Sequence, residues 1–135
     1  MEDIFVARVM STTVHTVTPD TLVETAAQVM LDKGIGSVVV VDDDNRLEGI
    51  LTTTDFVRIV SERQPKDQTP VSTYMSTDVI TTSAQDRIRD AADTMVDHDF
   101  HHIPVVDDEE GVIGMVTTSD LAGYLSRVQA PSPSE

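Results

Sequence analysis

The sequence predicts a mixed α/β fold, of the α+β type, made of two tandem copies of one strand-helix-strand-strand-helix unit. The chain repeats itself: Val6–Phe56 aligns with Val71–Leu121 without a gap, at an offset of 65 residues. Within each copy, apolar residues recur first at helical spacing and then in a continuous apolar run. Because solenoid repeats have periods of roughly 20–50 residues, this longer period indicates a duplicated supersecondary unit.

The first copy opens with a short apolar turn and an extended stretch. The turn covers Val6–Met10, and the stretch passes through Val14 and Val17. Pro19 and Asp20 then break the chain, as this dipeptide does in turns. The sequence therefore predicts a first strand that ends before residue 19.

A helix follows, for which Thr21 and Glu24 have the spacing of a capping box. Gly34 stands where a left-handed helix end is expected. The apolar residues recur at helical spacing and predict one buried face. That face comprises Leu22, Val23, Ala26, Ala27, Met30 and Leu31.

The second half of the copy predicts a hairpin and another helix. The β-branched run Ser37–Val41 predicts a strand buried on both faces, and Asp42–Asn45 the turn after it. Leu47–Leu51 is the expected returning strand, and Thr53–Arg63 the expected helix. The side chains that we expect this helix to bury are those of Phe56, Val57, Ile59 and Val60.

The second copy predicts a helix from about Asp86 to His98, strands at His102–Val106 and Val112–Val116, and a last helix ending near Val128. The expected organisation is thus repeat 1 at 1–63, a polar linker at 64–70 and repeat 2 at 71–128. The Pro-rich tail 129–135 has nothing to bury, which predicts disorder.

The charge balance is strongly acidic, with 24 acidic residues against 9 basic ones and a net charge of −15. Such a surface repels itself unless salt screens it, so it favours a halophilic protein, although an ordinary acidic regulatory domain would also fit. A nucleic-acid partner is disfavoured because there is no basic stripe. Cys is absent, and no apolar run approaches the roughly 20 residues of a membrane span. We therefore expect a cytoplasmic protein that is not membrane-bound.

One motif carries possible chemistry, Gly-h-h-Thr-x-x-Asp (h, apolar), at Gly49–Asp55 and Gly114–Asp120. It places a Thr and an Asp where a strand enters a helix, and the helix N-terminus favours an anion. The carboxylate has two acceptor oxygens, which suits the two hydroxyls of a ribose. The Gly lets a flat base or a neighbouring backbone come close. The same Thr-x-x-Asp spacing also describes a plain capping box that needs no ligand.

Other site types are weakly represented. His98, His101 and His102 could ligate a metal, but a His at a helix end commonly serves the last carbonyls, so no metal site is expected. Asp42–Asn45 lacks the Gly and Glu of a calcium loop. No Ser or Thr is placed with a His and an acid as a nucleophile, so the chain is not expected to be an enzyme or to hold a catalytic cofactor.

The layout resembles a tandem pair of cystathionine-β-synthase (CBS) domains, often called a Bateman module, here with the composition of a haloarchaeal protein. In the first copy the matching residues are Val9–Ser11, Thr16–Asp20, Gly34–Asp42 and Gly49–Asp55. In the second copy they are Tyr74–Ser76, His101–Asp107 and Gly114–Asp120.

This resemblance implies that the two copies pack through their sheets with pseudo-two-fold symmetry and form two clefts for AMP, ADP, ATP or S-adenosylmethionine. His101 and His102 occupy the place of a His-Arg pair on the phosphates, with His instead of Arg as the second member. In the first copy, the implied ligand-binding residues are Thr16, Val17, Thr18, Ile35, Gly36, Ser37, Thr52, Thr54 and Asp55. In the second, they are Thr81, Thr82, Ser83, Phe100, His101, His102, Pro104, Thr117, Ser119 and Asp120.

The resemblance therefore implies a non-catalytic sensor that binds an adenosine ligand and acts on an unidentified effector protein or on its own assembly, as a homodimer. The alternative is a ligand-free CBS-type scaffold for dimerisation or protein interaction. The negative charge disfavours ATP more than AMP, and does not disfavour S-adenosylmethionine, which has a positive centre. Gly36 and Ser37 occupy the positions in the first copy that His101 and His102 occupy in the second. We therefore expect the histidine-lined cleft to bind phosphate more tightly.

Overall fold

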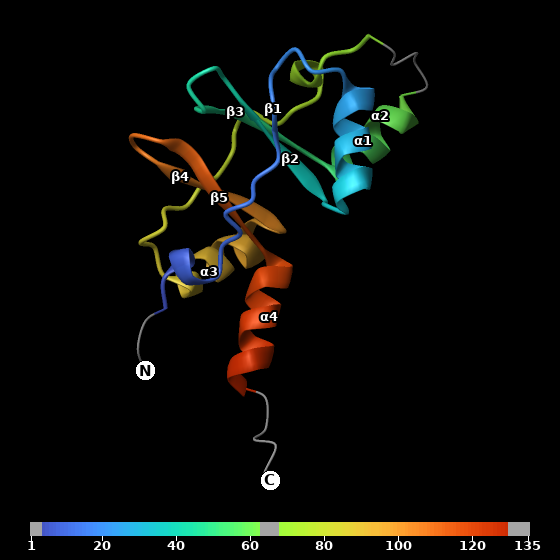
Figure 1. Cartoon of the computed structure of the whole chain (residues 1–135). Helices are drawn as coiled ribbons and strands as arrows, with labels where there is room; N and C mark the ends of the chain where they lie inside the picture. Colours follow the sequence, from blue (N-terminus) through green and yellow to red (C-terminus); the bar gives the residue numbers. More distant parts are fainter. Residues whose placement is uncertain (1–3, 63–67, 130–135) are drawn as a thin grey trace. The chain divides into compact units, whose positions relative to one another are not determined.

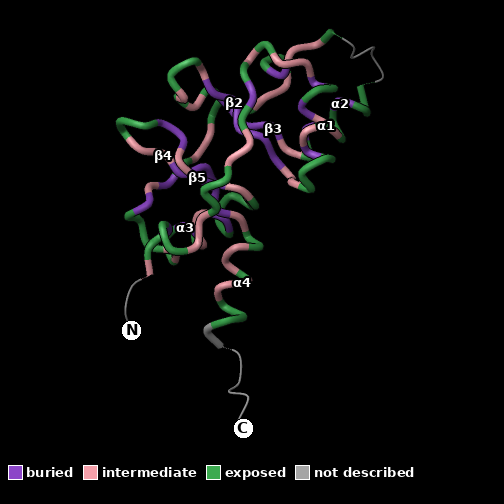
Figure 2. Tube along the Cα trace, in the orientation of Figure 1, coloured by how far each residue is buried: buried purple, intermediate pink, exposed green. Residues whose placement is uncertain are grey.

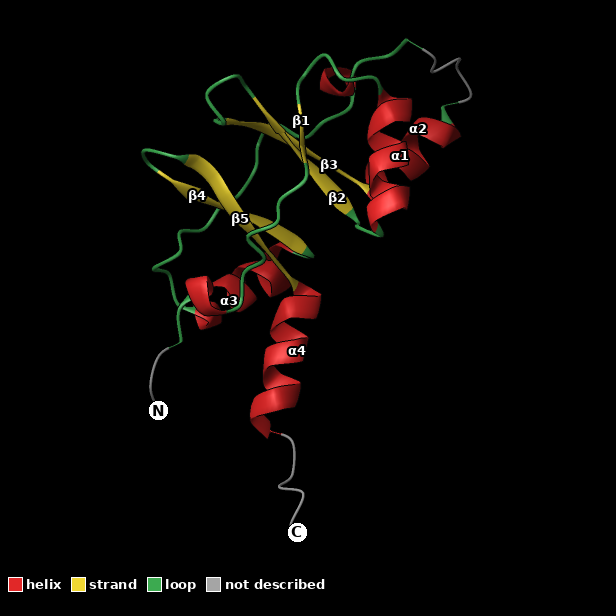
Figure 3. Cartoon of the chain, in the orientation of Figure 1, coloured by secondary structure: helices red, strands yellow, loops and turns green. Residues whose placement is uncertain are grey.

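The computed structural model describes residues 4–62 and 68–129 and confirms the predicted mixed α+β fold (Figures 1 and 3). Residues 1–3, 63–67 and 130–135 lie outside the described residues; they include the last residue of the expected helix 53–63 and parts of the expected linker and tail. The elements of the first copy are η1 (Val6–Arg8), β1 (Thr16–Val17), α1 (Val23–Lys33), β2 (Ser37–Val41), β3 (Leu47–Thr52) and α2 (Thr53–Ser61). Those of the second are η2 (Val71–Thr73), α3 (Ile88–His98), β4 (His102–Asp107), β5 (Gly111–Thr117) and α4 (Thr118–Gln129).

The chain divides into two compact units. Unit A comprises Val14–Ile80 and Asp108–Val112, and unit B comprises Met1–Thr13, Thr81–Asp107 and Ile113–Glu135. Unit A holds most of the first repeat and unit B most of the second, but each unit also contains a segment of the other repeat.

Unit A is built on a sheet in the order β1-β2-β3, with β1 parallel and β3 antiparallel to β2. Every residue of β2 is buried, as predicted from its β-branched sequence, and the strand is purple throughout in Figure 2. The core that joins α1 and α2 to this sheet consists of Val17, Val23, Ala26, Met30, Val38, Val40, Leu51, Ile59 and Val71.

Unit B is built on the antiparallel pair β4-β5 with α3 and α4. Its core consists of Val6, Ala84, Ala91, Met95, Ile103, Val105 and Val116. Val6 comes from η1, so the N-terminal segment of the first repeat is part of this core.

The 3-10 helices of the two repeats are exchanged between the units. In unit B, the amide of Val6 donates to Asp86 O (2.7 Å), and Ile4 O accepts from the first amide of α3, that of Ile88 (2.8 Å). In unit A, the amide of Val71 donates to Thr21 O (2.7 Å), and Thr69 O accepts from the first amide of α1, that of Val23 (2.8 Å). The chain just before each 3-10 helix thus supplies a backbone carbonyl that satisfies an orphan amide at the start of the other repeat's helix.

The capping box that the sequence predicts at Thr21 and Glu24 is not formed, so this prediction is wrong. The exchanged segment satisfies the first amide of α1 instead. The N-cap of α1 is Leu22, whose side chain makes no capping bond. Thr21 Oγ1 instead accepts from the amide of Thr18 (3.1 Å), and Glu24 accepts from the amide of Gln68 (3.4 Å). At its other end, α1 terminates as predicted at Gly34, with φ 64° and ψ 39°.

Three apolar side chains that we expected to be buried are exposed. Leu31 is 76% exposed, Val57 70% and Val60 77%. Asp55 and Ile59, one turn apart, are the buried residues of α2. Because Val57 and Val60 lie off this stripe, α2 has an outward apolar surface as well as its core face.

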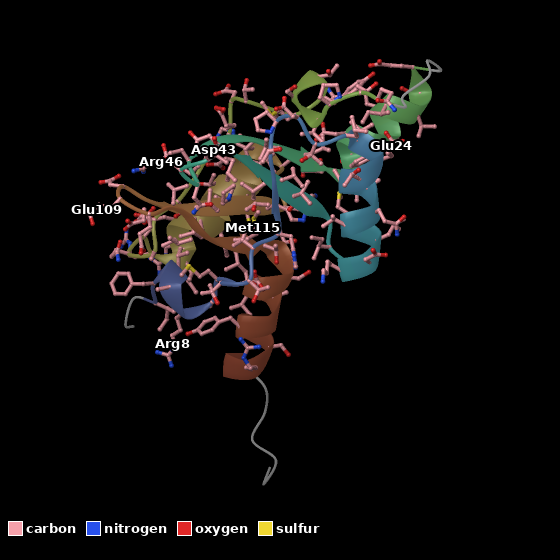
Figure 4. The ribbon with its side chains drawn as sticks, turned by 45° about the horizontal axis from the view of Figure 1, so that its top comes forward. Arg8, Glu24, Asp43, Arg46, Glu109 and Met115 are labelled. Atoms are coloured by element: carbon pink, nitrogen blue, oxygen red, sulfur yellow. The ribbon has the colours of Figure 1, made fainter. Side chains whose placement is uncertain are left out.

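The turn of the second hairpin belongs to unit A and is held there by the turn of the first (Figure 4). Asn45, with φ 65°, donates its side-chain amide to Glu110 O (2.9 Å) and Val112 O (2.7 Å), and its carbonyl accepts from the amide of Val112 (3.0 Å). The guanidinium of Arg46 donates to Asp108 O (2.6 Å) and Glu109 O (3.1 Å). The turn of the first repeat therefore provides hydrogen-bond partners for backbone groups in the turn of the second.

The first strand that the repeat order predicts in the second copy is reduced to a single parallel bridge between Thr82 and Val105. In the first repeat the ladder includes a bond from the amide of Val39 to His15 O (3.3 Å). The residue equivalent to Val39 is Pro104, which has no N–H to donate. The bonds from Thr82 to Pro104 O (3.0 Å) and from Val106 to Thr82 O (2.9 Å) remain.

Candidate functional site

In unit A, two predicted site segments meet where β3 enters α2. The antiparallel register places Ser37 opposite Thr52, and the amide of Thr53 donates to Gly36 O (3.1 Å). The head of β2 and the start of α2 therefore lie side by side.

Both carboxylate oxygens of Asp55 accept hydrogen bonds from residues at this junction. Its Oδ2 accepts from the amide of Thr52 (2.8 Å) and from Thr52 Oγ1 (3.2 Å). The Thr52 side chain in turn accepts from the backbone amide of Asp55, which completes a capping box. Asp55 Oδ1 accepts from the guanidinium of Arg58, one turn further along α2. The Asp55 side chain is only 7% exposed, whereas that of Arg58 is 56% exposed. The carboxylate is thus withdrawn from water and fully engaged by the protein.

The other predicted residues of the first repeat lie at varying distances along the sheet. Thr16 is exposed and pairs with Val39, two residues along β2 from Ser37, whereas Val17 lies in the core. Thr18 lies past the end of β1 and is engaged by Thr21. Ile35 packs against the core, and Thr54 is exposed on the first turn of α2. The structure brings Gly36, Ser37, Thr52 and Asp55 together directly, and Thr18 is not among them.

In unit B, the junction of β5 with α4 repeats this geometry. The amide of Thr118 donates to His101 O (3.1 Å), so His101 has the place of Gly36. The amide of Thr117 donates to Asp120 Oδ2 (2.9 Å), and Thr117 Oγ1 accepts from the amide of Asp120 (3.1 Å). Ser119 is exposed on the first helical turn, and Asp120 is half-buried.

A second carboxylate, Asp86, organises the predicted backbone segment Thr81–Ser83. It accepts from Thr82 Oγ1 (2.8 Å) and from the amide of Ser83 (2.9 Å). The hydrogen bond from the Ser83 backbone, then that from the Thr82 hydroxyl, lowers the pKa of Asp86. Asp86 is absent from the predicted site, although its spacing from Ser83 is a capping pattern that the sequence displays. It fixes the Thr82 side chain, which is buried.

The histidines of unit B differ in environment. His102 is half-buried at the start of β4, whereas His101 is exposed. Burial, and to a lesser degree the neighbouring His101, lowers the pKa of His102, while Asp120 opposes this shift. The ring of Phe100 stacks on that of His98, with 5.4 Å between centroids and 18° between planes. One face of Phe100 is therefore occupied by the end of α3.

The motif glycines permit a close approach of backbone. A Cβ on Gly49 would lie 2.8 Å from Ser76 O and 2.7 Å from the Met75 sulfur, and one on Gly114 would lie 2.9 Å from Ser11 O. These positions flank the bridges between Ile50 and Ser76 and between Ser11 and Met115. Of the two partners that the sequence allowed, the structure shows backbone against these glycines.

The described part of the chain requires no ligand for its internal hydrogen bonding. Within residues 4–62 and 68–129, no buried side-chain nitrogen or oxygen lacks a hydrogen-bond partner. In the same ranges, no three or more His, Asp or Glu side chains are grouped so that they could hold a metal ion. None of the helices described there is long and apolar enough to cross a membrane.

Comparison with known proteins relates this arrangement to a family. The model of the CBS domain matches residues 6–62 and again residues 71–127. An uncharacterised 17.7 kDa protein of Acidianus ambivalens is 34% identical over 120 residues, which cover 89% of this chain and 72% of that protein.

Solved structures share the same fold. The CBS domain pair of protein MJ0100, in complex with 5-methylthioadenosine and S-adenosyl-L-methionine, superposes with a TM-score of 0.85 at 23% identity, covering 95% of this chain and all of that one. CBSX2 in complex with AMP gives a TM-score of 0.81 at 22% identity, covering 93% and 98% of the two chains. With both copies matched by the family model, this chain belongs to the CBS domain family.

Proposed function

We propose that this chain is a non-catalytic regulatory module that binds an adenosine ligand, one of AMP, ADP, ATP or S-adenosylmethionine. The observation that carries the proposal is the Thr-Asp arrangement at the entry to α2 and α4 in a chain of this family. It places amides of a helix N-terminus beside a carboxylate, a combination that suits phosphate and ribose. The adenosine compounds bound by the related CBS pairs also support this ligand class.

The proposed contacts follow the predicted residues. Thr52 and Thr117 bind phosphate, and Asp55 and Asp120 the ribose. The remaining predicted residues shape the base and phosphate positions, and those with the closest placement to the junctions are Gly36, Ser37, His101 and His102. Residues 1–63 and 71–128 are proposed as the repeats that supply these two half-sites, joined by the linker 64–70.

The net charge of −15 bears on which ligand binds. A polyanion such as ATP is repelled more than AMP, and S-adenosylmethionine, with a positive sulfonium, is not repelled. Salt at molar concentration would reduce this difference. We propose that the acidic surface serves a cytoplasm of high ionic strength, and the excess of 24 acidic over 9 basic residues supports this proposal.

The output of the module is proposed to be assembly or an effector protein. The outward side chains Val57 and Val60 of α2 offer apolar surface for a homodimer or for a partner. A ligand changes such an equilibrium only by binding one state more tightly than the other.

A ligand-free scaffold is the second candidate. It is favoured by the complete internal satisfaction of Asp55, which serves as a helix cap without any ligand. In this case Thr52-x-x-Asp55 has a purely structural role, and the exposed surface of α2 carries the function.

The two candidates are separated by a binding screen. Thermal unfolding is measured with AMP, ADP, ATP and S-adenosylmethionine at molar salt, followed by calorimetry. A ligand at about 100 times its Kd stabilises the folded state by about 2.7 kcal/mol. No change in Tm with any of the four compounds would exclude the sensor and leave the scaffold.

A further inference from the structure

The motif aspartates of the two repeats differ in what holds them. Asp55 has both oxygens engaged, Oδ2 by Thr52 and Oδ1 by Arg58. At the offset of 65 residues, the position of Arg58 is occupied in the second repeat by Gly123. A glycine has no side chain to pair with a carboxylate, so the second repeat lacks this device.

Asp120 correspondingly keeps a free oxygen. Its Oδ2 accepts from the amide of Thr117 (2.9 Å), and within residues 4–62 and 68–129 its Oδ1 accepts no hydrogen bond and forms no ion pair. The side chain is half-buried, whereas that of Asp55 is almost withdrawn from water. A ribose hydroxyl could donate to Asp120 without displacing any protein group.

We infer that the Arg58–Asp55 ion pair closes the half-site of the first repeat, so that an adenosine ligand occupies only the half-site of the second repeat, where Asp120 accepts the ribose. This inference rests on the proposed function and restricts it: of the two proposed half-sites, only that of Thr117 and Asp120 is occupied, and Thr52 and Asp55 bind no ligand while the ion pair is formed. Ribose binding at Asp55 would require a neutral hydroxyl to replace a guanidinium on a shielded carboxylate, and the charge-assisted bond is the stronger of the two.

The difference between the repeats can be exchanged by mutation. Gly123 lies within α4, and a Cβ there would meet only the guanidinium of Arg127, at an ordinary 3.4 Å. A Gly123→Arg side chain would start three residues after Asp120, as Arg58 does after Asp55. Arg58→Ala removes the pair in the first repeat while retaining a good helix former.

The test is calorimetric titration of the full chain with adenosine, AMP and S-adenosylmethionine, reading stoichiometry and affinity. We expect one ligand per chain in the wild type and two in Arg58→Ala. Gly123→Arg should weaken the affinity for the single ligand that the wild type binds by about three- to tenfold. The Arg58→Ala/Gly123→Arg double variant should bind mainly at the first repeat. Arg89→Ala on α3 is the matched control, since it removes the same charge from another exposed helical position, and it should keep one ligand per chain.

The outcomes separate this inference from the proposed function. Two equal events in the wild type, or one unchanged event in Arg58→Ala, would overturn the inference while leaving the sensor intact. Weaker binding in Arg58→Ala would also overturn it, because Arg58 would then bind the ligand. If none of the three compounds, nor ADP or ATP, binds the wild type or Arg58→Ala, both fail together. Should Gly123→Arg fail to fold, the stoichiometry of Arg58→Ala alone decides.

Discussion

The two repeats share a chain path but differ where each strand enters its helix. In the first, β1 and β2 form a short parallel ladder, and Arg58 forms an ion pair with the motif carboxylate of Asp55. In the second, the ladder shrinks to one bridge beside Pro104, and within residues 4–62 and 68–129 the carboxylate of Asp120 has no arginine partner. One architecture thus holds one junction whose carboxylate is fully hydrogen-bonded and one whose carboxylate keeps an oxygen without a partner among the described residues.

The hairpin turns differ in a similar way. The first turn has its left-handed residue at Asn45, and the second has it one repeat position later, at Gly111 with φ 81°. Asn45 uses this conformation to reach the backbone of the other turn. Changes at the turns, the carboxylates, the ladders and the histidine therefore test the comparison at four sites.

The largest effect is expected at Gly111. A Cβ there would overlap the carbonyl of Asn45, and φ 81° is strained for any residue with a side chain. Gly111→Val should therefore lower the free energy of unfolding by about 2–4 kcal/mol. Urea denaturation measures this change. Gly123→Ala is the control and should be neutral or slightly stabilising, because Gly123 lies in a helix and a Cβ there would meet only the flexible end of the Arg127 side chain, at 3.4 Å. An unchanged midpoint for Gly111→Val would show that the contact between the turns does not form in solution.

A smaller loss is expected at the carboxylates, and of a different kind in each repeat. Asp55→Ala leaves Arg58 without its partner and removes a cap, which should lower stability by about 2 kcal/mol. Asp120→Ala removes only the cap and should lower stability by about 1 kcal/mol. It should also weaken adenosine binding by about tenfold or more. Urea denaturation and calorimetry read the two effects. Equal affinity in Asp120→Ala and the wild type would make Asp120 a cap alone.

The ladders can be exchanged with one substitution in each repeat. Val39→Pro removes the bond to His15 O and should lower stability by about 1–2 kcal/mol. Pro104→Val restores a donor and should leave stability unchanged or raise it by up to about 1 kcal/mol. Amide hydrogen exchange reports whether a new protected amide appears at residue 104. Fast exchange there would show that the second ladder is short for another reason.

The sequence was informative wherever local chemistry decides the structure. The β-branched run predicted the bounds of β2, and Gly34 the end of α1. The spacing of Thr52 and Asp55 predicted a capping box that the structure contains. These features depend on residues a few positions apart, so pattern and local structure agree.

The remainder depends on contacts between distant residues. No pattern at Thr21 shows that Thr69 O satisfies the first amide of α1, because that carbonyl comes from the linker, far along the chain. Val57 and Val60 were expected inside because apolar residues on α2 cover more than one face, and only packing selects which face is buried. The Arg58–Asp55 pair has helical spacing, but a rotamer choice decides whether it forms.

The smallest effect concerns pH at the second repeat. Burial lowers the pKa of His102 below its ordinary value of 6.5, so the folded protein takes up this proton only at lower pH than the unfolded chain does. The contribution of His102 to stability is therefore fully present above pH 6.5 and is lost as the pH falls through the lowered pKa. A phosphate bound beside His102 would favour the protonated form, which opposes this loss.

AMP affinity should consequently rise by about threefold between pH 7.5 and 5.5, relative to a His102→Gln variant titrated identically. The variant is needed because the phosphate itself loses charge near pH 6, and this titration is common to both proteins. Adenosine, which has no phosphate, should bind both with the same pH profile. Superimposable AMP profiles would place the phosphate away from His102, and the asymmetry between the repeats would then rest on the carboxylates Asp55 and Asp120 alone.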